Sequence, residues 1–147
     1  MDREQALELI EKLSFFDDFS DKEKHFLSTL GSQIYKYLPS DTIIKEGEKD
    51  YSFFILLKGV VAIVKSNPTE KTITKLKTGA VFGEIGYVAK RERTTSVIAD
   101  GDVIALKFNT KDIDSLKPEI PTKLKNKLIE ILVTRLESMN DQVTRNY

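Results

Sequence analysis

The chain has 147 residues, with 23 basic and 23 acidic side chains, one histidine and no cysteine. This length suits a single domain with one continuous core, and the balanced charge gives no field that would draw the chain onto nucleic acid or an anionic membrane. Without cysteine there is no disulfide framework, and the acidic, amphipathic N-terminus does not resemble a targeting signal, so we expect a cytoplasmic protein without membrane insertion.

The first 31 residues predict helices. Apolar side chains recur at helical spacing from Arg3 to Leu13, which indicates a short amphipathic helix. Ser20 and Glu23 form the Ser-x-x-Glu pattern of a capping box, ahead of a second helix that ends at Gly31. Between these two segments lies an apolar cluster that we expect to join them, made of Phe15, Phe16 and Phe19.

Residues 32–108 change to a period of two and are rich in β-branched and aromatic residues, which is typical of strands. Turn residues, among them Asn67 and Pro68, separate the strands at short intervals. This spacing predicts an α+β protein, mainly β, built on an eight-stranded antiparallel β-roll of the jelly-roll type. The predicted strands are IYKYL, TIIKEG, SFFILLKG, VVAIVKS, TITKLKTG, AVF, TTSVIA and DVIALKF.

Helical character returns at residues 109–147. Asn109 can cap a turn that ends before Pro118, and a longer helix is predicted from about Thr122 to about Asp141. The apolar stripe of this helix packs either on the roll or on the twin helix of a homodimer. It consists of Leu124, Leu128, Leu132, Leu136, Met139 and Val143.

Composition and motifs argue against catalysis. A metal site of the kind found in jelly-roll enzymes needs several imidazoles, and this chain has only His25. No nucleophile elbow, phosphate loop or zinc-binding helix pattern is present in the sequence. We therefore expect no catalytic residues, no metal and no enzyme activity.

The stretch FGEIGYVAKRERTTSV, residues 82–97, has the features of an anion site. Gly83 follows a predicted strand and lets a ligand approach the backbone, and the next residues can form a tight helical turn with outward N–H groups. Arg93, at the start of the strand TTSVIA, can return to the same anion with paired N–H donors. Glu84 is an acceptor that suits a hydroxyl beside the phosphate, so the ligand is expected to be a sugar phosphate.

This stretch resembles the phosphate-binding cassette of the cyclic nucleotide-binding domain family, which reads approximately Phe-Gly-Glu-(Leu/Ile)-Ala, a variable loop, and Arg-(Ala/Thr)-Ala-(Thr/Ser)-Val. The upstream stretch IIKEGEKDYSFFILLKGVVAIV, residues 43–64, is similar to the strand-turn-strand signature of that family, with glycines at Gly47 and Gly59. Two positions depart from the pattern. Glu92 stands where proline is common, and Gly86 replaces the usual alanine.

The resemblance implies a site for cAMP or cGMP. In that site Glu84 would accept the ribose 2′-hydroxyl and Arg93 would pair with the cyclic phosphate, while nearby backbone completes the cradle. The hydroxyl of Thr94 could reach the guanine amino group of a syn nucleotide. The full predicted set of ligand-binding residues is Gly83, Glu84, Ile85, Gly86, Arg93, Thr94 and Thr95.

The leading interpretation is a non-catalytic sensor, a single domain of residues 1–147 that couples nucleotide binding to movement of its C-terminal helices and so signals to an unknown effector protein. One alternative is a protein-interaction module with a degenerate pocket, in which Arg93 pairs only with Glu84 or Glu92. Another is a fragment of a larger transcription factor, channel or kinase. As given, the chain has no room for a helix-turn-helix after its last helix.

Overall fold

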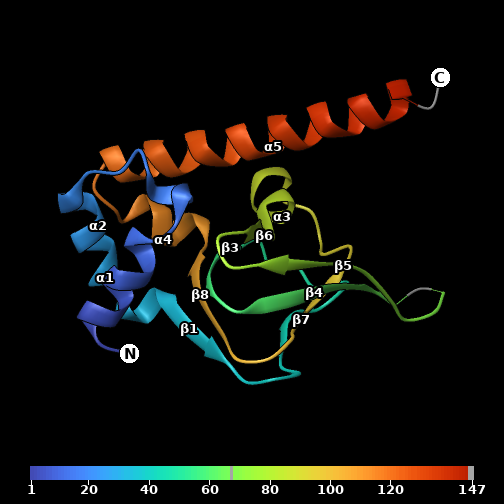
Figure 1. Cartoon of the computed structure of the whole chain (residues 1–147), viewed down its shortest axis with the longest axis horizontal. Helices are drawn as coiled ribbons and strands as arrows, with labels where there is room; N and C mark the ends of the chain where they lie inside the picture. Colours follow the sequence, from blue (N-terminus) through green and yellow to red (C-terminus); the bar gives the residue numbers. More distant parts are fainter. Residues whose placement is uncertain (67, 146–147) are drawn as a thin grey trace. The chain divides into compact units, whose positions relative to one another are not determined.

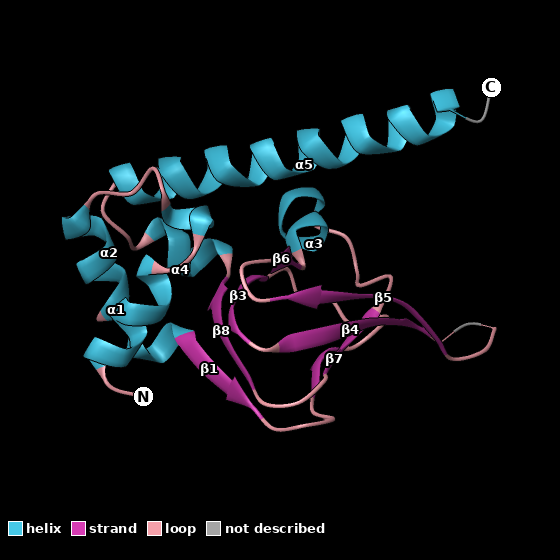
Figure 2. Ribbon diagram, viewed as in Figure 1, coloured by secondary structure: helices cyan, strands magenta, loops and turns pink. Residues whose placement is uncertain are grey.

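The computed structural model describes residues 1–66 and 68–145, with side chains up to residue 141, so Asn67 and the side chain of Val143 lie outside the described part. The chain forms two compact units, residues 1–114 and the segment from Ser115 onward. The helical elements (Figures 1 and 2) are α1 (Arg3–Glu11), η1 (Ser14–Phe16), α2 (Asp21–Ser28), η2 (Gly31–Gln33), α3 (Glu84–Ala89), α4 (Thr110–Asp114) and α5 (Glu119–Arg145).

The strands of the first unit form two antiparallel sheets, as the sequence predicts. They are β1 (Ile34–Tyr37), β2 (Thr42–Ile44), β3 (Phe53–Lys58), β4 (Val60–Lys65), β5 (Lys71–Lys77), β6 (Val81–Phe82), β7 (Ser96–Ala99) and β8 (Val103–Phe108). Among the described residues, one sheet has the order β1-β8-β3-β6 and the other β2-β7-β4-β5. The order of neighbours is not the order in the sequence, which is typical of a roll.

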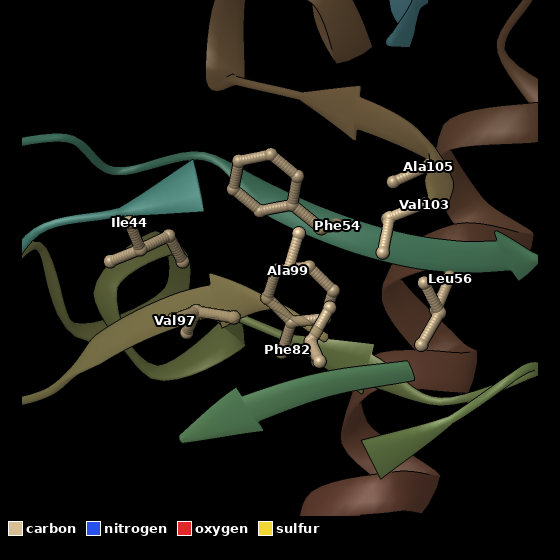
Figure 3. Packing of buried hydrophobic residues seen from close by; sticks show 9 residues of the cluster. Ile44, Phe54, Leu56, Phe82, Val97, Ala99, Val103 and Ala105 are labelled. Carbon is tan, nitrogen blue, oxygen red and sulfur yellow. The ribbon is translucent and has the colours of Figure 1, made fainter. Parts of the chain in front are cut away.

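The core of the roll lies between the inner faces of the two sheets (Figure 3). Phe54 of β3 and Phe82 of β6 stack there with ring centroids 4.9 Å apart. On the other face of β3, Phe53 contacts Tyr87 of α3 edge to face at 4.9 Å. Both faces of β3 are therefore buried, which is why its sequence FFILL is continuously apolar instead of alternating.

Reciprocal capping fixes the starts of the first two α-helices, α1 and α2. The backbone N–H of Glu23 donates to Ser20 Oγ at 3.1 Å, and the N–H of Ser20 donates to Glu23 Oε1 at 2.8 Å, which confirms the predicted capping box. The structure adds a second capping box at Asp2 and Gln5. The predicted aromatic cluster also forms, with centroids 4.9 Å apart for Phe15 and Phe16.

The two C-terminal helices begin at different kinds of signal. Asn109 caps α4 as predicted, because its Oδ1 accepts from the N–H of Asp112 at 2.8 Å. Helix α5, in the second unit, starts at Glu119, ahead of the predicted Thr122. Pro121 is accommodated because it lies in the first turn, where its missing N–H would have no intrahelical partner.

Across the described residues, no helix combines the length and the apolar composition that a membrane span needs.

Candidate functional site

The loop between β6 and α3 is built on a glycine with a left-handed backbone. Gly83 has φ 76° and ψ 4°, a region that side-chain-bearing residues rarely adopt. A Cβ at this position would lie 2.9 Å from the Ser52 carbonyl oxygen and 3.1 Å from Arg93 Nη1. Gly83 is thus required both by the turn and by the close packing of Arg93 against it.

Arg93 lies at the centre of the site. It is 6% exposed, and its terminal nitrogens donate to two backbone carbonyls, Nη1 to Gly83 at 2.8 Å and Nη2 to Ser52 at 2.5 Å. Asp50 Oδ2 lies 3.6 Å from Nη2. Burial lowers the pKa of the guanidinium, and the nearby carboxylates, Asp50 foremost, oppose that shift.

The backbone of Arg93 is held as firmly as its side chain. Its N–H donates to the Glu48 carbonyl at 2.8 Å, and its own carbonyl accepts from the N–H of Gly47 at 2.7 Å. These bonds join the segment before β7 to the turn between β2 and β3. They place the guanidinium between that turn and α3, so the two stretches that carry the family resemblance meet at one residue.

One nitrogen of Arg93 has no partner among the described residues. Nε is buried and makes no hydrogen bond there, although nearly all buried polar groups in folded proteins are paired. A buried donor without an acceptor costs about 1–3 kcal/mol. Nη1 and Nη2 each donate to a carbonyl, and Nε is the nitrogen without an acceptor among the described residues. Each terminal nitrogen carries two N–H groups, so the paired fork toward an anion stays a prediction.

Asp50 and Ser52 belong to this arrangement and were missed by sequence reasoning. The Asp50 carboxylate accepts from the Ser52 N–H at 3.1 Å and the Ser52 hydroxyl at 2.8 Å, and Lys107 Nζ lies 4.0 Å away. Burial by itself raises the carboxyl pKa, but the Ser52 bonds together with Lys107 and Arg93 outweigh it, so the pKa of Asp50 is lowered. The only sequence signal was an acidic residue in the turn within the 43–64 stretch.

The depressed pKa of Asp50 predicts a pH-dependent contribution to stability. Asp50→Asn should lower the free energy of unfolding at pH 7 by about 1–2 kcal/mol, below the full value for a charged hydrogen bond because the carboxylate is partly exposed. A group with a lowered folded-state pKa stabilises above its unfolded pKa of about 3.9 and loses this effect as the pH falls through the folded-state value. The difference between parent and variant should therefore be constant from pH 5 to 8 and shrink below about pH 4.

Urea unfolding followed by circular dichroism at pH 7, 5 and 3.5 measures this difference. The control is Asp18→Asn, because Asp18 is exposed in the first unit and surface substitutions usually change stability by less than about 0.5 kcal/mol. A parent-minus-variant difference that was unchanged at pH 3.5 would contradict the assigned role of the Asp50 carboxylate.

The remaining predicted residues differ in exposure. Glu84, in the first turn of α3, is 4% exposed, whereas the Ile85 side chain is 58% exposed. Thr94 is exposed and Thr95 is half-buried. Strand β7 begins at Ser96, two residues after the predicted start, so both threonines lie in the loop that follows Arg93.

The structure thus brings Gly83, Gly86 and Arg93 into direct packing, since a Cβ at either glycine would approach the guanidinium. The carbonyl of Thr94 accepts from Lys65 Nζ at 2.8 Å.

Within residues 1–66 and 68–141, no group of three or more histidine, aspartate or glutamate side chains could hold a metal ion.

Comparison with known proteins extends the match along the chain. The family model "Cyclic nucleotide-binding domain" matches residues 35–117, more than half of the 147 residues. Cyclic nucleotide-gated channel beta-3 of Mus musculus is 33% identical over 104 residues, which are 67% of this chain and 15% of that protein. The cGMP-dependent protein kinase of Toxoplasma gondii is 30% identical over 139 residues, which are 93% of this chain and 14% of that protein.

A solved structure supports the fold. The cyclic nucleotide-binding domain from Methylobacillus flagellatus superposes with a TM-score of 0.76 at 24% identity, over 99% of this chain and 84% of that one. This chain spans only 15% and 14% of the two longer relatives, so the comparison with them concerns one module. From the family model, the fold and the assembled cassette, the chain belongs to the cyclic nucleotide-binding domain family.

Proposed function

We propose that the chain binds a 3′,5′-cyclic nucleotide, cAMP or cGMP, with its phosphate at Arg93. The observation that carries this proposal is the buried Nε of Arg93, which has no acceptor among the described residues. A phosphate oxygen is a strong acceptor for a guanidinium N–H. Its arrival would satisfy a donor that the protein otherwise buries at a cost, so this part of the ligand gains more than an exposed ion pair would give.

The ribose is expected to lie against Glu84. This carboxylate is buried in the first turn of α3, directly after Gly83. When ionised, a carboxylate only accepts hydrogen bonds. A hydroxyl beside a singly charged phosphodiester can donate to it, whereas a free phosphate with two charges would be repelled. The pair Glu84 and Arg93 therefore favours a cyclic nucleotide over a linear monophosphate.

The module acts as a sensor and not as an enzyme in this proposal. Family membership supports a regulatory role, and the relatives' names refer to a cyclic nucleotide-gated channel and a cGMP-dependent kinase. A ligand can shift a helix arrangement only by its preference for one arrangement over another. Several expectations stay predictions. They are movement of the helices within residues 109–147, transmission to an effector protein, a homodimer through α5, a cytoplasmic location and the single-domain organisation.

Calorimetric titration tests the proposal. The parent chain is titrated with cAMP, cGMP and the linear 5′-monophosphates AMP and GMP. We expect saturable binding of at least one cyclic nucleotide and binding of its linear counterpart that is weaker by tenfold or more, about 1.4 kcal/mol. Absence of binding at millimolar cAMP and cGMP would favour the interaction module with a degenerate pocket.

Selectivity between the two nucleotides is predicted to involve Thr94. Its side chain is exposed in the loop before β7, and it directly follows Arg93 in the sequence. A hydrogen bond to the guanine amino group would benefit cGMP only, and one neutral bond has a net value of about 0.5–1.5 kcal/mol. Thr94→Ala should therefore lower cGMP affinity by up to about tenfold and leave cAMP affinity within about threefold.

The same titrations check this prediction, with Thr72→Ala as the control at an exposed threonine of β5. Equal losses for both nucleotides would show that Thr94 serves the phosphate or the backbone instead of the base.

A further inference from the structure

Helix α3 has part of the proposed binding site at one end and a lysine contact to α4 at the other. Its first residue is Glu84, and Gly83 directly before it provides the carbonyl that accepts from Arg93 Nη1. Lys90 follows its last residue, Ala89. The helix has six residues and is therefore only about 9 Å long, so a displacement of its first turn also moves Lys90.

Lys90 joins α3 to α4 through its ammonium group. Nζ donates to Oγ1 of Thr110, the first residue of α4, at 2.6 Å. The same nitrogen lies 4.5 Å from the ring centroid of Tyr87 in α3, which is within the range of a cation–π interaction. Lys90 thus contacts both helices, and all three residues belong to the first compact unit, residues 1–114.

The backbone of Lys90 is in a conformation that lysine rarely adopts. It has φ 54° and ψ 45°, in the left-handed region, where the residue that ends a helix is usually glycine. Its N–H donates to the Gly86 carbonyl at 3.0 Å and so closes the end of α3. Lysine costs conformational energy here that glycine would not, but a glycine could not make the contacts with Tyr87 and Thr110.

Tyr87 gives the ammonium a fixed contact on α3. Its ring is buried and lies edge to face against Phe53 of β3, with centroids 4.9 Å apart. Phe53 in turn lies 5.7 Å from Phe108, the last residue of β8. Burial, and after it the charge of Asp114 in α4, raises the pKa of the Tyr87 hydroxyl. The ring that Lys90 contacts is therefore held by its packing, on the side of α3 that faces α4.

We propose that Lys90 is a positioning residue that couples the cassette to α4: its ammonium holds the end of α3 on Thr110, so that a displacement of α3 by a bound nucleotide is passed to α4. The part of this inference that involves the nucleotide rests on the proposed function. A ligand changes a distant helix only through contacts that differ between two arrangements. The bond between Lys90 and Thr110 supplies such a contact.

Hydrogen exchange without nucleotide tests the contact itself. Lys90→Met removes the ammonium and keeps most of the side chain. The amides of α4 should then exchange about two- to tenfold faster than in the parent, the scale of one exposed cation–π contact together with one hydrogen bond. Arg91→Met is the matched control, because it removes the same charge from the next residue, which is exposed. Exchange of α4 in Lys90→Met that equalled the control would overturn the proposal.

Lys90→Gly separates the side-chain contact from the fold of α3. Glycine suits the left-handed backbone, so the amides of residues 84–89 should keep the protection that they have in the parent. The amides of α4 should nevertheless exchange as fast as in Lys90→Met, because the contact with Thr110 is lost. Faster exchange of α4 in Lys90→Met alone would show that the methionine disturbs α3, and the proposal would be wrong.

Exchange with saturating nucleotide tests the transmission. With whichever of cAMP and cGMP the parent binds, the exchange rate of the α4 amides should change by about twofold or more in the parent. At equal occupancy this change should be smaller in Lys90→Met and Lys90→Gly, whereas residues 82–88 should respond as in the parent. A lysine with a merely structural role would not alter the response. No response of α4 in the parent, or an equal response in the variants, would overturn the coupling.

These outcomes separate the inference from the proposed function. If the parent binds neither cAMP nor cGMP, the proposed function fails and transmission from a nucleotide fails with it. The exchange measured without nucleotide still decides whether Lys90 holds α4. If the parent binds and α4 responds equally in Lys90→Met, the proposed function stands and the inference on Lys90 is wrong.

Discussion

Arg93→Ala should lower the affinity for the cyclic nucleotide by about 2–5 kcal/mol, the range for removing one partner of a buried charge pair. This is a loss of roughly 30-fold to several thousand-fold. The effect is expected to be large because Arg93 is 6% exposed and its guanidinium is already oriented by two carbonyls, so the phosphate would lose a preorganised cation. Arg93→Lys should recover only part of the loss, since an ammonium cannot reproduce the planar set of donors.

Calorimetric titration of both variants measures these losses. Arg91→Ala is the matched control, because Arg91 is an exposed arginine two residues away in the same loop. It removes one positive charge and should change affinity by less than about 1 kcal/mol, the usual value for an exposed ion pair. If Arg93→Ala bound as tightly as the parent, the phosphate would lie elsewhere. If Arg91→Ala lost as much as Arg93→Ala, net charge and not the oriented guanidinium would account for binding.

Glu84→Ala should cost about 1.5–3 kcal/mol of binding free energy, the value of one hydrogen bond to a charged group. This is roughly a 10- to 150-fold loss. Glu84→Gln keeps an oxygen that can accept from the ribose hydroxyl, so its loss should be smaller. Both variants are checked by circular dichroism and thermal melting, because Glu84 is buried at the start of α3 and its replacement can affect folding.

The control for Glu84 is Glu92→Ala, an exposed glutamate of the same loop. A nucleotide lacking the 2′-hydroxyl gives a second measurement, because it should bind the parent more weakly and show little further loss in Glu84→Ala. Equal further losses for the 2′-hydroxyl and 2′-deoxy ligands would show that Glu84 supports α3 and does not accept from the ribose.

Local features of this protein were readable from the sequence because they depend on neighbours in the chain. The Ser20–Glu23 capping box and the Asn109 cap involve residues three apart, and their partners lie within one helical turn. The β-branched and aromatic residues of 32–108 and the turn residues between them indicated the strands, because such side chains fit a pleated, buried or half-buried surface. The Gly-Glu and Arg elements of the cassette were identified by residue chemistry and by their resemblance to the family pattern, and their role in binding stays a prediction.

Boundaries were less predictable where tertiary structure competes with propensity. The β-branched run TTSVIA favours a strand from Thr94, but β7 begins at Ser96, after the bonds that tie the Arg93 backbone to the turn at Gly47 and Glu48. Helix α5 starts before Pro121, and a proline in the first turn is compatible with that start although it reads as a break in the sequence.

Only the tertiary structure decided what Arg93 does with its donors. Its partner carbonyl at Ser52 is 41 residues away, and Asp50 reaches the same guanidinium from the same turn. No periodicity links these positions, because their approach depends on how the sheets and the loop from β2 to β3 pack together. The sequence by itself predicted a roll with a phosphate-binding cassette. The tertiary structure decided that Nη1 and Nη2 donate to the carbonyls of Gly83 and Ser52 and that Nε has no acceptor among the described residues.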